Sequence, residues 1–282
     1  MTTQPEDAPI ETLLRVVTWN IWWQFGPWKA GGPAILATLA ELDADLIALQ
    51  EVWSDSPTNH AAILAEQLGY HHVHGTGMRQ KGVVTGDAIL SRWPITRHDM
   101  IRLYDQKGIE ENRVAVFAEI DGPRGPLCLV STHLNWKQQH SHIRQRQIAD
   151  LAGFVAKNQA GTYPPIVCGD FNAEPVSDEI RMMTGDTDCP VEELVFHDAW
   201  AFAGDGGTGY TWDISNPHAA TVLEPNRRID YIFAGWPGKR GAGHILDCQV
   251  TCDKPVGGDR KSTRPNSSHV VNSYAAFCLT IT

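Results

Sequence analysis

Apolar runs along this chain end repeatedly in a polar side chain. In the clearest case, the run Ile-Val-Cys-Gly at residues 166–169 leads into Asp170, Phe171 and Asn172. Two prolines precede the run, and Ala-Glu-Pro at 173–175 predicts that the strand stops there. Side chains two apart in a strand point the same way, so Asp170 and Asn172 are predicted to face one site. The alternative is a polar strand end that only caps a turn.

Three other predicted strands end in the same manner. Residues 13–19 form an apolar and β-branched run that ends at Asn20, and residues 46–50 form one that ends at Glu51. A third run, 127–131, is followed by Thr-His-Leu-Asn, in which His133 and Asn135 alternate onto one face. Neighbouring strands can bring such ends together, so we expect these side chains at one edge of a sheet.

Helices and further strands are predicted between these runs. Pro33 can open a helix with apolar positions 35, 36, 39 and 42, residues 59–68 predict a helix ending at Gly69, and 145–157 predict another. We interpret the basic residues Lys137, Arg144 and Arg146 as the solvated side of that last helix. Strands are predicted at 70–74, 86–92, 113–120, 127–131 and 229–233. The turn at 121–125 joins two of them as a hairpin, so the sheet is mixed.

The predicted strand 229–233 carries one acid, Asp230, among apolar neighbours. An unpaired carboxylate in a buried strand costs several kcal/mol or shifts its pKa. We therefore expect a partner for Asp230, and a histidine is the partner that the chemistry favours.

The composition narrows the class of protein. The chain has 282 residues, of which 42% are hydrophobic and 20% charged, as in an ordinary globular protein of one large domain. Its net charge of −10 argues against a broad phosphate-neutralising surface and disfavours duplex DNA as substrate. Residues 1–12 are expected to be disordered, without a targeting signal, and no uncharged run is long enough to span a membrane. We expect a cytoplasmic monomer with reduced cysteines.

The polar strand ends suggest a metal. Asn20, Glu51 and Asp170 offer oxygen ligands only, and such ligands suit Mg²⁺ or Mn²⁺ better than zinc.

Six short segments, in order along the chain, carry a resemblance to a known family. They are Thr18-Trp19-Asn20, Leu49-Gln50-Glu51-Val52, Ala88-Ile89-Leu90-Ser91-Arg92, Thr132-His133-Leu134, Gly169-Asp170-Phe171-Asn172 and Arg228-Ile229-Asp230-Tyr231. Together they cover residues 15–258, and their order makes the set far more specific than any one segment. The sequence resembles the endonuclease/exonuclease/phosphatase family of DNase I-like, metal-dependent phosphoesterases.

This resemblance implies a fold and a metal site. The expected fold is a four-layer α/β sandwich, in which two mixed β-sheets pack face to face and helices flank them. The matching positions imply that Asn20, Glu51 and Asp170 hold Mg²⁺, with Mn²⁺ as the other candidate. The domain is expected to span residues 13–258.

The resemblance also implies catalytic roles. Asp170, with Asn172, would orient and deprotonate an attacking water, and His133 and Asn135 would contact the scissile phosphate. Asp230 would pair with a late histidine, for which the chain offers His269. The expected reaction is hydrolysis of a phosphodiester or phosphomonoester, with a phosphorylated small molecule, a lipid headgroup or nucleic acid as substrate.

The C-terminal residues 259–282 depart from the family pattern. The family has Ser-Asp-His before its final strand, whereas this chain has Ser267-Ser268-His269. The composition from Asp259 onward also resembles translated adapter sequence, which would make this tail non-native. Residues 274–281 are nevertheless apolar enough for a strand. Two alternatives to the phosphoesterase stay open: a nuclease, and a catalytically impaired binding module of the same fold.

Overall fold

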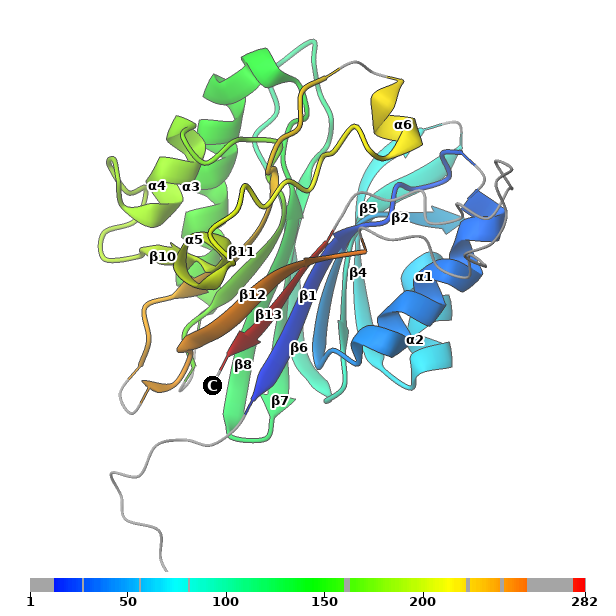
Figure 1. The fold of residues 1–282 in the computed structure, drawn as a ribbon, viewed down its shortest axis with the longest axis horizontal. Coiled ribbons are helices and arrows are strands. Elements are labelled where there is room, and N and C mark those ends of the chain that lie inside the picture. The colour runs from blue at the N-terminus through cyan, green and yellow to red at the C-terminus, as the bar shows by residue number, and fades with distance from the viewer. Residues whose placement is uncertain are drawn as a thin grey trace, which may run out of the picture.

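The computed structural model describes residues 13–26, 28–55, 57–80, 82–159, 163–221, 224–238, 241–252 and 276–281. Two β-sheets pack face to face, with helices on both outer sides (Figure 1). The predicted four-layer α/β sandwich of two mixed sheets is confirmed.

The first sheet, called sheet A here, has the strand order β12-β13-β1-β2-β5-β4, with the short β3 paired to β2. Its strands are β1 (Leu14–Asn20), β2 (Leu46–Asp55), β3 (Thr58–Asn59), β4 (His71–Gln80), β5 (Val83–Ser91), β12 (Ile245–Thr251) and β13 (Ala276–Ile281). β1 and β2 are parallel, and the other pairs are antiparallel. The predicted strand at 274–281 is therefore present, between β12 and β1.

The second sheet, sheet B, has the strand order β10-β11-β9-β8-β7-β6. Its strands are β6 (Ile95–Arg102), β7 (Val114–Gly122), β8 (Gly125–His133), β9 (Ile166–Asp170), β10 (Phe196–Asp198) and β11 (Asp230–Gly235). β8 and β9 are parallel, and the predicted hairpin of β7 and β8 is confirmed.

Helices cover the outer face of each sheet. The helices are α1 (Trp28–Leu42), α2 (His60–Leu68), η1 (Gln138–His140), α3 (Ser141–Asn158), α4 (Asp178–Thr184), α5 (Ala199–Ala203) and α6 (Pro217–Ala220). α2 begins at its N-cap Asn59 and ends at Gly69, which has φ 71°. In the described part of the chain no helix is both long and apolar enough to cross a bilayer.

Alternate residues of the central strands belong to different layers of the core. Val16 of β1 packs between the two sheets with Val116 and Cys168 of sheet B. Its neighbour Val17 points outward and packs against Ile35 of α1. The period of two along each strand thus fills the inner layer and the helix-covered layer at once.

Several predicted boundaries are wrong. α1 begins at Trp28 and carries Pro33 in its interior instead of at its start. β2 does not end at Glu51 but runs on to Asp55 through a β-bulge, because residues 50 and 51 together lie opposite one residue of β5. The half-exposed strand β6 was not predicted. Arg144 is not solvated: it is buried on α3 and forms an ion pair with Glu179.

Candidate active site

Strand register brings the polar ends of sheet B together. The parallel register of β8 and β9 places His133 beside Asp170. The antiparallel register of β9 and β11 places Asp230 on the other side of Asp170. Gly169 permits the close packing of these strands, since a Cβ there would lie 1.9 Å from the carbonyl oxygen of Thr132.

Asp170 is held by short contacts on both carboxylate oxygens. Its Oδ1 accepts the backbone N–H of Asn172 at 2.9 Å, and its Oδ2 accepts Nδ2 of Asn20 at 3.1 Å. The Asn172 side chain reaches His133 Nε2 at 3.0 Å and the Leu134 carbonyl at 3.2 Å. β9 ends at Asp170, and Asn172 has φ 51°, so a turn rather than strand alternation brings these two side chains to one site.

His133 lies between two acids. Its Nε2 is 3.6 Å from Asp170 Oδ2 and its Nδ1 is 4.0 Å from Glu51 Oε1. Burial, followed by repulsion from Arg113, holds the pKa of His133 well below its ordinary value, so the ring is neutral. With Asn172 donating to Nε2, the imidazole proton sits on Nδ1, the nitrogen that faces Glu51.

Sheet A contributes Asn20 and Glu51 to the same cluster. Asn20 ends β1, and its Nδ2 donates to Glu51 Oε1 at 3.4 Å as well as to Asp170. The left-handed residue Trp22 (φ 61°) turns the chain so that its N–H caps Asn20 Oδ1 at 3.0 Å. The amide nitrogen of Asn20 therefore faces the carboxylates, and Asn20 would have to turn its amide to offer oxygen to a cation.

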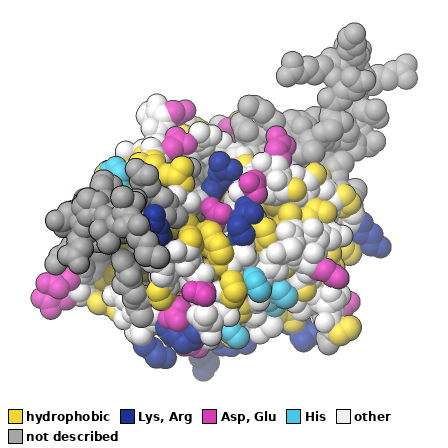
Figure 2. Space-filling view, turned by 90° about the horizontal axis from the view of Figure 1, so that it is seen from below, with side chains coloured by type: hydrophobic (Ala, Val, Ile, Leu, Met, Phe, Trp, Pro, Cys, Tyr) yellow, Lys and Arg dark blue, Asp and Glu magenta, His cyan; other side chains and the backbone are white. Residues whose placement is uncertain are grey.

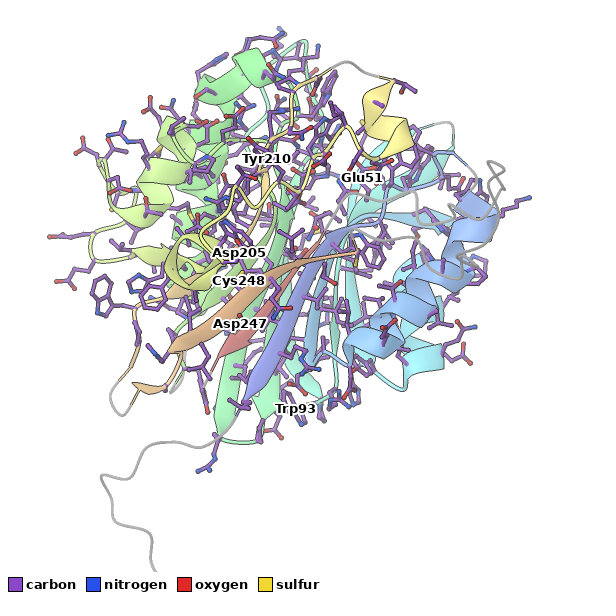
Figure 3. The ribbon with its side chains drawn as sticks, in the orientation of Figure 1. Glu51, Trp93, Asp205, Tyr210, Asp247 and Cys248 are labelled. Carbon is purple, nitrogen blue, oxygen red and sulfur yellow. The ribbon has the colours of Figure 1, made fainter. Side chains whose placement is uncertain are left out.

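Glu51 reaches the site because of the bulge in β2. The bulged residue has φ 56°, a conformation that an L residue rarely adopts and that is common at functional sites. In Figure 3, Glu51 lies near the upper end of the sandwich and Trp93, which follows β5, near the lower end. Gln50 is the other residue of the bulge. Its buried amide donates to Ser131 Oγ at 3.1 Å and so ties sheet A to sheet B.

The carboxylates of the cluster hold their protons unusually strongly. Burial raises the pKa of Glu51 to about 7, although Arg113 and the Asn20 hydrogen bond lower it. Burial also raises the pKa of Asp170, against the lowering effect of its hydrogen bonds. The pKa of Asp230 is raised well above its ordinary value, first by burial and then by repulsion from Asp170.

Asp230 lacks the partner that the sequence predicts. Neither of its carboxylate oxygens has a hydrogen-bond partner in the described part of the chain, although its backbone N–H donates to Thr211 Oγ1 at 3.2 Å. His269 and Ser268 lie outside the described residues. The pairing of Asp230 with a late histidine therefore stays a prediction.

Asn135 is placed differently from the expectation. Its Nδ2 donates to Glu111 Oε1 at 2.8 Å, and its Oδ1 lies 2.9 Å from His140 Nδ1. Because β8 ends at His133, Asn135 does not continue the alternation that would have put both side chains on one face. It joins the site through Glu111 instead.

Three charged residues near the cluster were missed by the sequence analysis: Asp87, Glu111 and Arg113. With Glu51 and His133 they line a cleft that is open to solvent. Asp87 lies on β5 opposite the bulge and is only 2% exposed. Burial, with repulsion from Glu51 and Asp170, raises its pKa well above the ordinary value. The signal that could have found it is the one used for Asp230, a lone acid in an apolar strand.

The described residues fit a divalent cation by their charge. Glu51 Oε2 and both oxygens of Asp230 are buried without hydrogen-bond partners, and Arg113 is the single cationic side chain among the described residues lining the cleft. Buried carboxylates that lack such partners favour a cation. No three His, Cys, Asp or Glu side chains of the described residues already enclose a metal position. Mg²⁺ tolerates this, since it commonly takes one or two carboxylates and keeps water or phosphate oxygens as its other ligands.

Known proteins share this fold and parts of this sequence. Protein angel of Drosophila melanogaster is 27% identical over 196 residues, which cover 64% of this chain and 53% of that protein. The chain thus matches about half the length of that relative. The human Nocturnin catalytic domain with bound sulfate anion superposes with a TM-score of 0.67 at 20% identity, covering 98% of this chain and 96% of that one. Danio rerio TDP2 complexed with single strand DNA product gives 0.71 at 17%, covering 96% and 100%.

The family assignment rests on the match to a family profile over most of the chain. The profile of the Endonuclease/Exonuclease/phosphatase family matches residues 17–239, a stretch that begins within β1 and ends after β11 and so contains the described cluster from Asn20 to Asp230. Members of this family are hydrolases that act on phosphoester bonds and generally depend on divalent metals. The chain belongs to the Endonuclease/Exonuclease/phosphatase family.

Proposed function

We propose that this protein is a Mg²⁺-dependent phosphoesterase that hydrolyses a phosphodiester or phosphomonoester by in-line attack of water. The observation that supports it most is a set of carboxylates at one rim: Asp87, Asp170 and Asp230 are buried, and Glu51 is partly buried beside them. Among the described residues, the arginines whose charge acts on Asp170 are Arg113 and Arg227. A site of this charge is suited to holding a cation against an anionic phosphoryl group.

Asp170 is the proposed general base. Its Oδ1 is fixed by the Asn172 N–H, and Oδ2 faces the cluster. In the proposed step, the water oxygen forms a bond to phosphorus, the water proton passes to Asp170, and the bond from phosphorus to the leaving oxygen breaks. The neutral His133 is proposed to donate from its imidazole N–H to a phosphoryl oxygen, which a cluster of carboxylates alone could not do.

Asn20, Glu51 and Asp170 are the residues proposed to hold the metal. Mg²⁺, or Mn²⁺ in its place, supplies charge neutralisation and polarises a phosphoryl oxygen when bound. Asn135 is proposed to act at the phosphate through its contact with Glu111, and Asp230 to orient the late histidine.

The test is hydrolysis of a generic aryl phosphodiester. Mg²⁺ is expected to support turnover, EDTA to abolish it, and Asp170→Asn to lower kcat by about 10³-fold or more, because the base is lost while the side chain keeps its shape. Full activity of Asp170→Asn would refute the assignment of the base. Full activity in EDTA would refute the metal.

The substrate class is proposed from charge. The net charge of −10 favours a small phosphorylated molecule, a nucleotide or a lipid headgroup over duplex DNA. Figure 2 views the lower end of the sandwich, away from the rim that carries Glu51, and on its described surface Lys and Arg are interspersed with Asp and Glu. The second candidate is a nuclease, because the similar Danio rerio TDP2 is complexed with a single strand DNA product. Plasmid nicking, assayed beside phosphoinositide and sphingomyelin hydrolysis, separates the two.

A binding module without catalysis is the remaining alternative, and its motivation is Ser268 at the position where the family has aspartate. Ser268→Asp discriminates between the two. A large gain in rate identifies an impaired enzyme, whereas inactivity of both proteins, with no measurable affinity for divalent metal, supports a binding role.

A further inference from the structure

The cleft beside the carboxylate cluster contains an arginine that none of the proposed roles uses. Arg113 lies directly before β7 and lines the cleft together with Glu51, Asp87 and His133. Its side chain is 15% exposed, so most of the guanidinium is shielded from bulk water while part of it remains reachable from the cleft.

The guanidinium of Arg113 is anchored on one side only. Its Nε donates to Glu111 Oε2 at 2.8 Å, and this is its one side-chain hydrogen bond within the described residues. The two terminal nitrogens have no protein acceptor there. An arginine fixed through Nε presents its other edge as a planar pair of donors, which is the geometry that binds two oxygens of a phosphate.

Glu111 is itself held in place from three directions. Its Oε1 accepts Nδ2 of Asn135 at 2.8 Å, and its backbone N–H donates to Asp105 Oδ1 at 3.0 Å. The second oxygen of Asp105 accepts the N–H of Asn112 at 3.0 Å. The loop that carries Arg113 is therefore tied to Asn135, which lies two residues after His133, the last residue of β8.

The positive charge of Arg113 changes the pKa values of four groups in the cluster. It lowers the pKa values of Glu51, Asp87 and Asp170, and it also lowers that of His133. Arg113 nevertheless pairs with Glu111 and forms no ion pair with those three acids in the described part of the chain. The residue thus lines the cleft, and its terminal nitrogens are not taken up by a carboxylate of the described residues.

We propose that Arg113 binds the non-bridging phosphoryl oxygens of the substrate from the cleft, and that Glu111 is the positioning residue that aims it. This proposal rests on the proposed function and adds to it a phosphate-binding residue on the side of the site away from Asp230. The ligand chemistry is a tetrahedral oxyanion, and free inorganic phosphate, a product or product analogue, shares it.

The first test separates phosphate binding from a structural role. Arg113→Gln is expected to lower kcat/KM for the aryl phosphodiester by about 10²- to 10³-fold, as expected for loss of one preorganised electrostatic contact. Arg113→Lys keeps the charge but not the paired donors, and it is expected to recover only part of that loss. The matched control is Arg181→Gln on α4, whose side chain is 43% exposed and pairs with Asp178. It should leave kcat/KM unchanged.

Chemical rescue of turnover distinguishes a direct contact with the phosphate from a purely structural role of Arg113, because added guanidinium would not restore a lost structural contact. Guanidinium ion at low, non-denaturing concentration is expected to restore turnover to Arg113→Ala in a saturable manner and to have no such effect on wild type or Arg181→Gln. If Arg113→Ala does not fold, the comparison of Arg113→Gln with Arg113→Lys stands in its place. Unchanged kcat/KM in Arg113→Gln, or an Arg113→Ala that folds but is not rescued, would overturn the proposal.

Glu111→Gln tests the positioning role. The amide has one acceptor oxygen in place of two, so it can no longer accept from both Arg113 Nε and Asn135 Nδ2, and it lacks the charge. KM is therefore expected to rise, and the melting temperature is expected to fall less than in Glu179→Gln. An unchanged KM would remove Glu111 from the proposal.

Phosphate binding distinguishes failure of this proposal from failure of the proposed function. Inorganic phosphate, titrated calorimetrically in the presence of Mg²⁺, is expected to bind wild type at least tenfold more tightly than Arg113→Gln. If wild type shows no hydrolysis but this difference is present, the proposed function fails and the phosphate site stands. If hydrolysis is metal-dependent but phosphate binds both proteins equally, only the role of Arg113 fails.

Discussion

Buried charges occur in two regions of this molecule, and the two regions treat them differently. Under the helices of sheet B, Arg144 Nε lies 2.5 Å from Glu179 Oε1, and Arg228 pairs with Asp198 at 2.7 Å. These charges are matched one to one and their remaining polar atoms are largely hydrogen-bonded. At the upper rim, three buried carboxylates and the partly buried Glu51 form no ion pair with an arginine among the described residues, and several of their oxygens have no hydrogen-bond partner.

The difference separates charges that are matched within the fold from charges that remain available to a ligand. The matched pairs fix local geometry. Arg144, for example, also donates to the carbonyls of Lys137 and Gln138 and so shapes the segment after His133. The rim keeps its charges unmatched at the expense of stability, which is common where function requires it.

Breaking a matched pair is expected to have the largest effect on stability. Glu179→Gln leaves the Arg144 charge buried and only 3% exposed, and should lower the free energy of unfolding by about 3–5 kcal/mol. Asp170→Asn, at the rim, should not lower it, because the substitution removes a charge that the fold leaves incompletely compensated. Urea unfolding of both variants measures the contrast, and equal losses would contradict it.

The pH dependence of the rim is expected to be a smaller effect. Burial raises the pKa of Glu51 from 4.5 to about 7, so the folded protein holds this proton more strongly than the unfolded chain. The resulting stabilisation is complete below pH 4.5 and is lost as the pH rises through 7. In EDTA, the melting temperature of wild type minus that of Glu51→Gln should therefore fall between pH 4.5 and about pH 8.

Repeating these melting-temperature measurements with added Mg²⁺ tests whether Glu51 binds the metal. If the metal binds Glu51, it should raise the melting temperature of wild type more at high pH than at low pH, because the ionised carboxylate is the ligand. Glu51→Gln should show a much weaker response. A pH-independent difference between the two proteins in EDTA would indicate that Glu51 is not perturbed.

The smallest effect is expected at the surface. Arg181 pairs with Asp178 at 3.1 Å, with side chains 43% and 60% exposed. Arg181→Gln should change the free energy of unfolding by less than about 0.5 kcal/mol, as is usual for solvated pairs. A loss comparable to that of Glu179→Gln would mean that burial is not what distinguishes the two kinds of pair.

The sequence predicts the parts of the fold in which local pattern and tertiary environment agree. β1 and β9 are short apolar runs that end in polar residues, and both strands lie where expected with Asn20 and Asp170 at their ends. β6 was missed because its Ile95–Arg102 stretch is half-exposed and rich in charged residues, so it lacks a continuous apolar signal. The bulge at Glu51 was missed because a two-to-one register is a property of the strand pair and not of one strand.

The candidate site was predictable in part for the same reason. Asn20, His133 and Asp170 end strands of the two parallel pairs, β1 with β2 and β8 with β9, whose carboxyl ends lie at one rim. Glu51 and Asn172 join them through the bulge in β2 and the turn after β9. The pattern that marks Asp230, a lone acid in an apolar strand, also marks Asp87. Arg113 was not predictable, since its place in the cleft depends on the loop at 103–113 and on the hydrogen bond between Glu111 and Asn135, which are 24 residues apart.

The position of β13 has a consequence for how the molecule assembles. This strand, Ala276–Ile281, pairs on one side with β1 and on the other with β12. Until it is in place, β1 presents an open edge of unpaired backbone groups, although β1 is made first among the described strands. Sheet A can therefore be completed only after residues 276–281 have left the ribosome, and this long-range closure predicts slow folding with a need for protection from aggregation in the interval.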